Sequence, residues 1–165
     1  MEFHINIISS EGGEPIVSPC LFTVHNRRSD VILKIGDEKL HVSKDLLAVH
    51  FPVFEAMLFG NFDEKDKEEV EIKDVVYQEF VDLLNLIYIK SVEITDRTVL
   101  HILKLADRFQ MEDVMELAKK HLTQSKGFNT AKKLLIADQC RLDSVRDHCL
   151  QSFSSVTDLL KELKS

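Results

Sequence analysis

The sequence contains no run of about 20 apolar residues, the length that a membrane-spanning helix needs, so no segment is expected to cross a membrane. Residues 1–8 are apolar but lack a basic start and a small-residue cleavage site, which argues against a secretory signal. Only three cysteines are present, an odd number at unrelated spacings. Such a count fits free thiols in a reducing compartment better than a disulfide framework. We therefore expect an intracellular protein, cytoplasmic, nuclear or both.

Basic residues are in the minority. The chain of 165 residues has 21 Lys and Arg against 28 Asp and Glu, a formal net charge of −7. A negative field disfavours binding to a phosphate backbone, and no basic patch interleaved with aromatic residues is present. Nucleic acid is therefore not expected as a direct partner. The length corresponds to one domain, or to one domain with a small appendage.

Motifs that carry chemistry are also missing. The seven histidines show no metal-ligand spacing, and there is no glycine-rich phosphate loop and no nucleophile elbow. We therefore expect no metal, no cofactor and no catalytic residue. A hydrolase that uses Cys140 or Cys149 is the least favoured alternative, because both lie on or beside apolar helix stripes, where a free cysteine is typically a core residue.

The N-terminal half of the sequence predicts a small sheet followed by short helices. Residues 1–28 form an arm with the glycine, serine and proline content of a loop, although residues 16–24 could add a strand or a helical turn. Residues 30–35 read as a strand and residues 36–38 as a turn, and residues 39–42 return with a polar–apolar alternation, which together predict a β-hairpin. Ser43 is a candidate N-cap for a helix to about residue 49, and Pro52 suits the first turn of the next helix.

The C-terminal half of the sequence is mainly helical in pattern. A charged segment at 59–69 precedes a short strand at 70–72, and three amphipathic helices follow between residues 77 and 122. Residues 123–128 form a joint, and three short helices are predicted at 129–137, 142–153 and 156–163. The sequence therefore predicts an α+β fold, with a hairpin-containing sheet flanked by helices and a C-terminal helical box.

The order of these parts resembles the BTB/POZ domain, whose sheet is mostly three-stranded. The resemblance covers about residues 29–122 and rests on the words SDVIL, LHVSK, PVFEAML, VEIKDV, LLNLIY and LLKLADRF. The likeness is to BTB domains of nematode and speckle-type adaptors, in which the BTB domain follows a MATH domain. It implies an arm at 1–28, a BTB/POZ domain at 29–124 and a BACK-like helical box at 125–165.

The resemblance implies a protein-binding function without catalysis, as an adaptor that binds the N-terminal region of the cullin-3 ubiquitin-ligase scaffold. The family's contact there is a hydrophobic–any–acidic motif, which Phe62-Asp63-Glu64 matches in type and position. Phe59, Phe109 and Met111 are further candidates. Two alternatives stay open: that the rings of Phe59 and Phe62 fold back onto their own domain, and that Phe109 and Met111 are core residues.

The resemblance also implies self-association through the arm and the first core helix. Leu46 falls on the dimer interface by position, and Leu21 and Phe22 are weaker candidates; Asp30 could pair with Lys44 near that seam. Because the arm is short and broken by prolines, the homodimer is expected to be weakened or rearranged. The alternative function is a homodimerising, co-regulator-binding BTB module without cullin binding. The substrate protein is not identifiable from the sequence.

Overall fold

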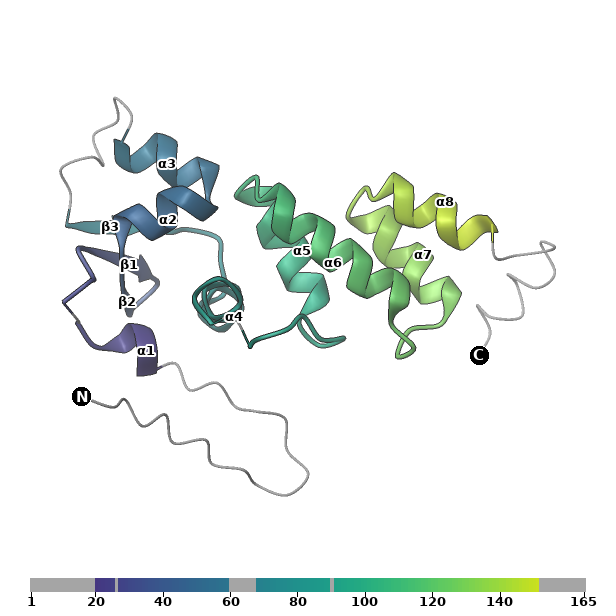
Figure 1. Ribbon diagram of the computed structural model, residues 1–165, viewed down its shortest axis with the longest axis horizontal. Coiled ribbons are helices and arrows are strands. Elements are labelled where there is room, and N and C mark those ends of the chain that lie inside the picture. Colours follow the sequence, from purple (N-terminus) through teal and green to yellow (C-terminus); the bar gives the residue numbers. More distant parts are fainter. Residues whose placement is uncertain (1–19, 26, 60–67, 90, 152–165) are drawn as a thin grey trace, which may run out of the picture.

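A computed structural model describes residues 20–25, 27–59, 68–89 and 91–151, and its centre is a three-stranded sheet (Figure 1). Strand β1 (Val31–Ile35) pairs antiparallel with β2 (Glu38–Val42) and parallel with β3 (Glu69–Glu71), in the order β2-β1-β3. Gly36 turns the hairpin with φ +61°, a conformation that glycine adopts without a steric penalty. The predicted hairpin and the α+β class are confirmed.

Eight helices complete the part of the chain that the structure describes. They are α1 (Cys20–Thr23), α2 (Lys44–His50), α3 (Pro52–Phe59), α4 (Tyr77–Tyr88), α5 (Val99–Arg108), α6 (Glu112–Gln124), α7 (Thr130–Gln139) and α8 (Asp143–Gln151). Figure 1 shows the sheet with α2 and α3 at one end of the molecule, α4 to α6 in the middle, and α7 and α8 at the other end. The predicted helix at 156–163 lies outside the described residues. No described helix has the length and apolar character needed to cross a membrane.

The N-terminus of α2 is capped differently from the sequence prediction. Ser43 has the extended backbone of an N-cap residue, but its side chain makes no capping hydrogen bond. The backbone N–H of Lys44 instead donates to Asp30 Oδ1 at 2.7 Å. A carboxylate at the start of β1 therefore satisfies a free N–H of α2 and meets the positive end of its dipole. Asp30 thus pairs with the main chain of Lys44 and ties the sheet to α2.

Four phenylalanine rings hold the helices to one another. Phe51, Phe54, Phe80 and Phe109 are each at most 4% exposed. The Phe109 ring stacks on Phe54, with centroids 5.4 Å apart and planes at 14°, and meets Phe51 and Phe80 edge-on at 5.7 and 5.6 Å. We call these rings the phenylalanine cluster. It connects segments almost 60 residues apart in the sequence, so the sheet end and the α4–α6 part share one core.

Candidate functional site

Helix α3 presents an aromatic ring to solvent at its C-terminal end. Phe54 and Leu58 bury the inner face of the helix at 0% and 1% exposure, whereas Phe59, its last residue, is 51% exposed. Among the residues predicted to contact the cullin scaffold, Phe59 therefore lies on the surface. Phe62, Asp63 and Glu64 lie outside the described residues, so their contact role stays a prediction. The alternative in which the Phe59 ring folds back onto its own domain is not what the structure shows.

Phe109 and Met111 lie in the core, at 4% and 3% exposure, which is the alternative that the sequence left open for both. The reason is the way α5 ends. Gln110 adopts a left-handed backbone with φ 56°, and the N–H of Met111 donates to the carbonyl of Ala106 at 2.8 Å. This is the hydrogen bond of a Schellman motif, which turns the following apolar residue back against the helix. The side chains of Phe109 and Met111 are therefore not accessible to a partner at the surface.

Of the predicted dimer residues, Leu46 is the one whose described side chain reaches the surface. Phe22 is 2% exposed and packs edge-on against Tyr88 with centroids 5.0 Å apart, so its ring belongs to the chain's own core. The side chain of Leu21 lies outside the described residues. Leu46 on α2 is half-buried, and Val49 on the same helix is 77% exposed. We call Leu46 and Val49 the α2 surface pair.

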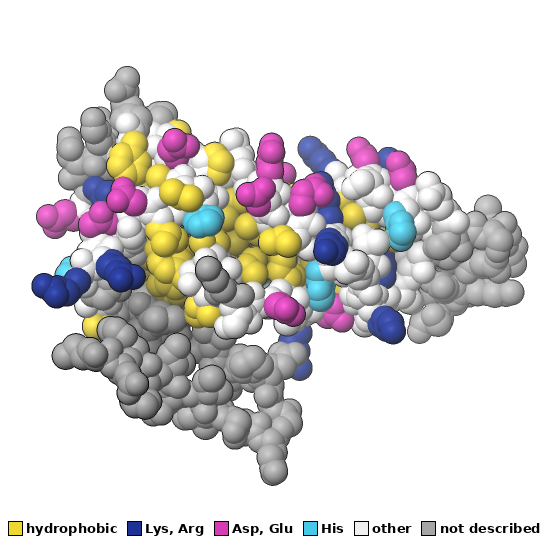
Figure 2. Space-filling model, in the orientation of Figure 1, with side chains coloured by type: hydrophobic (Ala, Val, Ile, Leu, Met, Phe, Trp, Pro, Cys, Tyr) yellow, Lys and Arg dark blue, Asp and Glu magenta, His cyan; other side chains and the backbone are white. Residues whose placement is uncertain are grey.

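Figure 2 shows that one face of the molecule carries a broad apolar area in its middle, over the region of α2, α4 and α5.

Val49 of the α2 surface pair was not singled out from the sequence. The signal was present, because residues 46–49 are four consecutive apolar residues, and a helix buried along one face cannot cover all four. Leu47 is the member that points inward, at 0% exposure.

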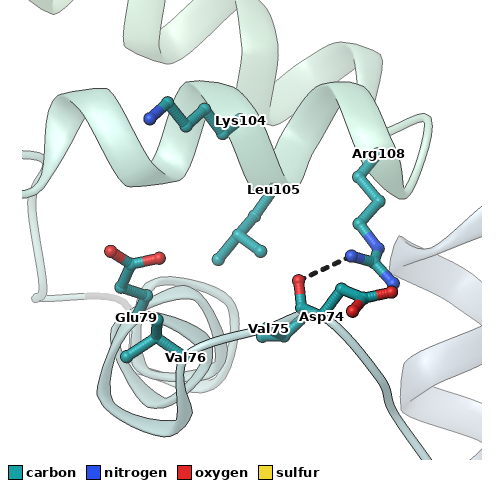
Figure 3. Close-up of a pocket in the computed structure, with 7 residues that line it drawn as sticks. All are labelled: Asp74, Val75, Val76, Glu79, Lys104, Leu105 and Arg108. Atoms are coloured by element: carbon teal, nitrogen blue, oxygen red, sulfur yellow. Dashed lines mark hydrogen bonds between the residues drawn. The ribbon is translucent and has the colours of Figure 1, made fainter.

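A shallow groove of about 420 Å³ lies between α5 and the segment that enters α4 (Figure 3). Leu105 points into the groove from α5, opposite Val75 and Val76. Arg108 closes one end by donating to the backbone carbonyls of Asp74 and Lys73 at 2.7 and 2.6 Å. These bonds hold Asp74 in a left-handed backbone conformation, φ 54°, that non-glycine residues rarely adopt. None of the predicted contact residues whose side chains the structure describes lines this groove.

Cys140 and Cys149, the two cysteines whose side chains the structure describes, have the properties of packed thiols. Cys149 is 2% exposed and Cys140 is half-buried, and burial raises the pKa of both thiols. A raised pKa lowers the fraction of thiolate, the form that acts as a nucleophile. In the described part of the chain, no three His, Cys, Asp or Glu side chains come together in a way that could hold a metal ion.

Comparisons with known proteins agree with this architecture. The model of the BTB/POZ domain family matches residues 22–126. The Caenorhabditis elegans proteins "BTB and MATH domain-containing protein 38" and "BTB and MATH domain-containing protein 36" are 39% and 36% identical over 130 and 131 residues. Each match covers 79% of this chain but only 34% and 41% of the relative, so the chain spans well under half the length of these proteins.

Among solved structures, the BTB domain of human gigaxonin is similar with a TM-score of 0.50 and 20% identity, over 58% of this chain and 79% of that one. The BTB domain of zebrafish PATZ1 matches with a TM-score of 0.50 and 25% identity, over 59% and 77%. The sheet order, the helices around it and the matched family model lead to one conclusion: the chain belongs to the BTB/POZ domain family.

Proposed function

We propose that this protein-interaction module acts as an adaptor that binds the N-terminal region of a cullin-3 scaffold, with the C-terminal end of α3 at the centre of the contact. The observation that carries the proposal is the 51% exposed ring of Phe59. It stands at the start of an acidic segment that contains Phe62, Asp63 and Glu64. An apolar ring rimmed by charge is the usual composition of a protein–protein hot spot.

The size of the ring sets the expected contribution. A phenylalanine side chain offers roughly 150–250 Å² of surface, so covering the exposed half of Phe59 removes about 100 Å² from water. At about 25 cal/mol per Å², this burial stabilises a complex by about 2.5 kcal/mol. That is within the range of a hot-spot residue, for which truncation costs about 2 kcal/mol or more. The carboxylates nearby would chiefly accelerate association with a basic partner.

The relatives support an adaptor architecture. Their names pair a BTB domain with a MATH domain, and a Kelch-like protein of mouse is 33% identical over 96 residues, 58% of this chain and 17% of that protein. In such an arrangement the BTB part would supply the scaffold contact, and another domain would recognise the substrate.

The experiment is a titration of the full chain with a purified cullin-3 N-terminal domain by isothermal calorimetry. Phe59→Ala and Phe62→Ala are expected to weaken binding by at least about 30-fold each, the ratio that corresponds to about 2 kcal/mol. Glu64→Lys is expected to slow association. Leu117→Ala is the matched control, because Leu117 is a 55% exposed apolar residue on α6, away from the proposed contact. Unchanged affinity in both phenylalanine variants, with unchanged circular dichroism, would overturn the proposal.

The second candidate is a homodimerising module, and the α2 surface pair favours it. Val49 is the most exposed of the large apolar side chains that the structure describes, at 77%, and Leu46 lies on the same helix. Because a two-fold dimer meets itself through the same patch on both copies, one exposed helix face is sufficient to form its centre. The two candidates use different helices, so one protein can have both functions.

Sedimentation velocity over a range of concentrations tests self-association. Leu46→Asp and Val49→Asp each place a charge in the proposed seam and are expected to shift the dimer to monomer. Leu135→Asp, at a 56% exposed position on α7, is the control and should leave association unchanged. A wild-type chain that stays monomeric at high concentration would remove this candidate.

A further inference from the structure

A polar junction forms where the chain passes from α6 to α7. Asp96 lies in the turn before α5, and its Oδ1 accepts hydrogen bonds from His121 Nε2 at 2.9 Å and from Ser125 Oγ at 2.6 Å. The oxygen of Ser125 in turn accepts the backbone N–H of Gly127 at 3.0 Å. One carboxylate therefore connects the start of α5, the last turn of α6 and the segment that leads to α7.

Both sides of this junction are ordered independently of Asp96. On the α5 side, the hydroxyls and main chains of Thr95 and Thr98 bond to one another, with the N–H of Thr95 donating to Thr98 Oγ1 at 2.9 Å. On the other side, the N–H of Ser125 donates to the carbonyl of His121 at 2.8 Å. The ammonium of Lys133 on α7 donates to the carbonyl of Thr123 at 2.8 Å. Asp96 thus connects two segments that are already held in shape.

The way α7 and α8 pack makes their orientation depend on this junction. Helices α7 and α8 pack closely on one another, and the pair meets the rest of the described chain mainly where α8 lies on α6. Val145 and Cys149 of α8 are each 2% exposed at this end of the molecule, and Leu122 of α6 is fully buried. The pair meets α6 through the short α8 face and the hydrogen bond from Lys133 to Thr123, so a further attachment at the joint limits how far the pair can rotate.

The charges around Asp96 favour its ionised form. The hydrogen bond from Ser125, and then the one from His121, lower the pKa of the Asp96 carboxyl, and Lys133 acts in the same direction. Arg97 and Lys126 line the same surface depression. The carboxylate is therefore a stable acceptor for both donors throughout the neutral range.

We infer that Asp96 is a positioning residue that fixes the direction in which the α7–α8 pair leaves the BTB/POZ core. The three hydrogen bonds at Asp96 and Ser125 form the lock. Opening the lock leaves the pair attached through the contact between α8 and α6 and the hydrogen bond from Lys133 to Thr123, about which it can rotate. The domain therefore presents its C-terminal helices to any partner at a set angle. This inference is independent of the identity of that partner.

Gly127 supplies a second way to open the lock. A Cβ atom at this position would lie 1.9 Å from Asp96 Oδ2 and 2.9 Å from Asp96 Cγ. Because the carboxylate is the end of a side chain, it would turn away rather than displace the backbone. Gly127→Ala therefore removes the carboxylate from its two donors without changing any charge, whereas Asp96→Ala removes the acceptor itself.

The test is the measurement of backbone residual dipolar couplings in the full chain by NMR. In the wild type, the amides of α4–α5 and of α7–α8 are expected to fit one alignment tensor of one magnitude, as for a rigid body. In Asp96→Ala and in Gly127→Ala, the tensor of α7–α8 is expected to fall in magnitude below that of α4–α5. The amide of Gly127 is expected to exchange with solvent about fivefold faster, because it loses its ordered acceptor.

The controls separate the lock from general stability. Glu93→Ala removes an exposed carboxylate from the same segment and should leave both tensors equal. Hydrogen exchange in α4 and α5 should be unchanged in all variants, a result that a merely destabilised core would not give. A single shared tensor in either lock variant overturns the inference. No cullin is present in this experiment, so its failure is distinct from a failure of the proposed function.

Discussion

Replacement of Phe109 by alanine is the most direct test of the core described above. This ring is 4% exposed and contacts three other rings of the phenylalanine cluster at 5.4–5.7 Å. Truncation of a buried phenylalanine costs about 3–5 kcal/mol, because the apolar atoms are lost and the cavity closes only in part. The rigid neighbours Phe51, Phe54 and Phe80 are expected to hold the cavity open. We therefore expect a cost in the upper half of that range.

The assay is urea unfolding followed by circular dichroism at a fixed protein concentration, so that self-association does not alter the comparison. In a separate thermal scan, a cost of this size corresponds to a fall in Tm of roughly 8–20 °C for a domain of this length. Phe109→Leu should lose much less stability, because the leucine side chain fills most of the space of the ring. Phe59→Ala, at a 51% exposed position, should stay within about 0.5 kcal/mol of the wild type. A loss below about 1 kcal/mol for Phe109→Ala would refute the assignment of this ring to the core.

Three further predictions concern capping, thiols and protonation. Asp30→Ala should destabilise the protein by about 1 kcal/mol in the same urea assay, because the N–H of Lys44 loses its acceptor, and a cost near zero would contradict the capping role. Iodoacetamide should alkylate Cys140 and Cys149 slowly at neutral pH and faster as pH rises, since burial raises both pKa values; rapid labelling at neutral pH would contradict this. Because Ser125 and His121 lower the pKa of Asp96, the stability from its ionised form is present above the ordinary carboxyl range and is lost as pH falls through the lowered value. An NMR titration of the Asp96 carboxyl carbon should show this low midpoint in the wild type and a higher one in Ser125→Ala.

The regular elements were predictable because local patterns determine them. The short run of mostly apolar residues at 31–35, bounded by a turn, predicts β1, and the apolar spacing from Tyr77 onward predicts a helix that begins at that residue. The parallel pairing of β1 with β3 has no such signal. It joins Leu33 to Val70, and that register depends on how the intervening helices pack.

The errors occur where tertiary contacts override local preference. The N–H of Lys44 at the start of α2 is capped by Asp30, fourteen positions earlier in the sequence. The prediction that the hydroxyl of Ser43 caps this helix was therefore wrong. The apolar residues after α5 were ambiguous because the left-handed position of the Schellman motif is Gln110 rather than glycine. Leu142 follows the same arrangement after α7, with Arg141 at φ 55°. Neither ending carries the usual glycine signal.

The attachment of α7 and α8 determines where the protein is expected to unfold locally. In the described part of the chain, this pair rests mainly on one helix of the body, whereas the phenylalanine cluster ties α3, α4 and the end of α5 together. Contiguous units with fewer buried contacts open at a lower free energy than the whole molecule. Proteases act on such partly open forms. Within the part of the chain that the structure describes, limited digestion should therefore cut first near the joint at residues 125–128 and release a resistant core. Among the described helices, α7 and α8 are expected to open as a unit at the lowest free energy.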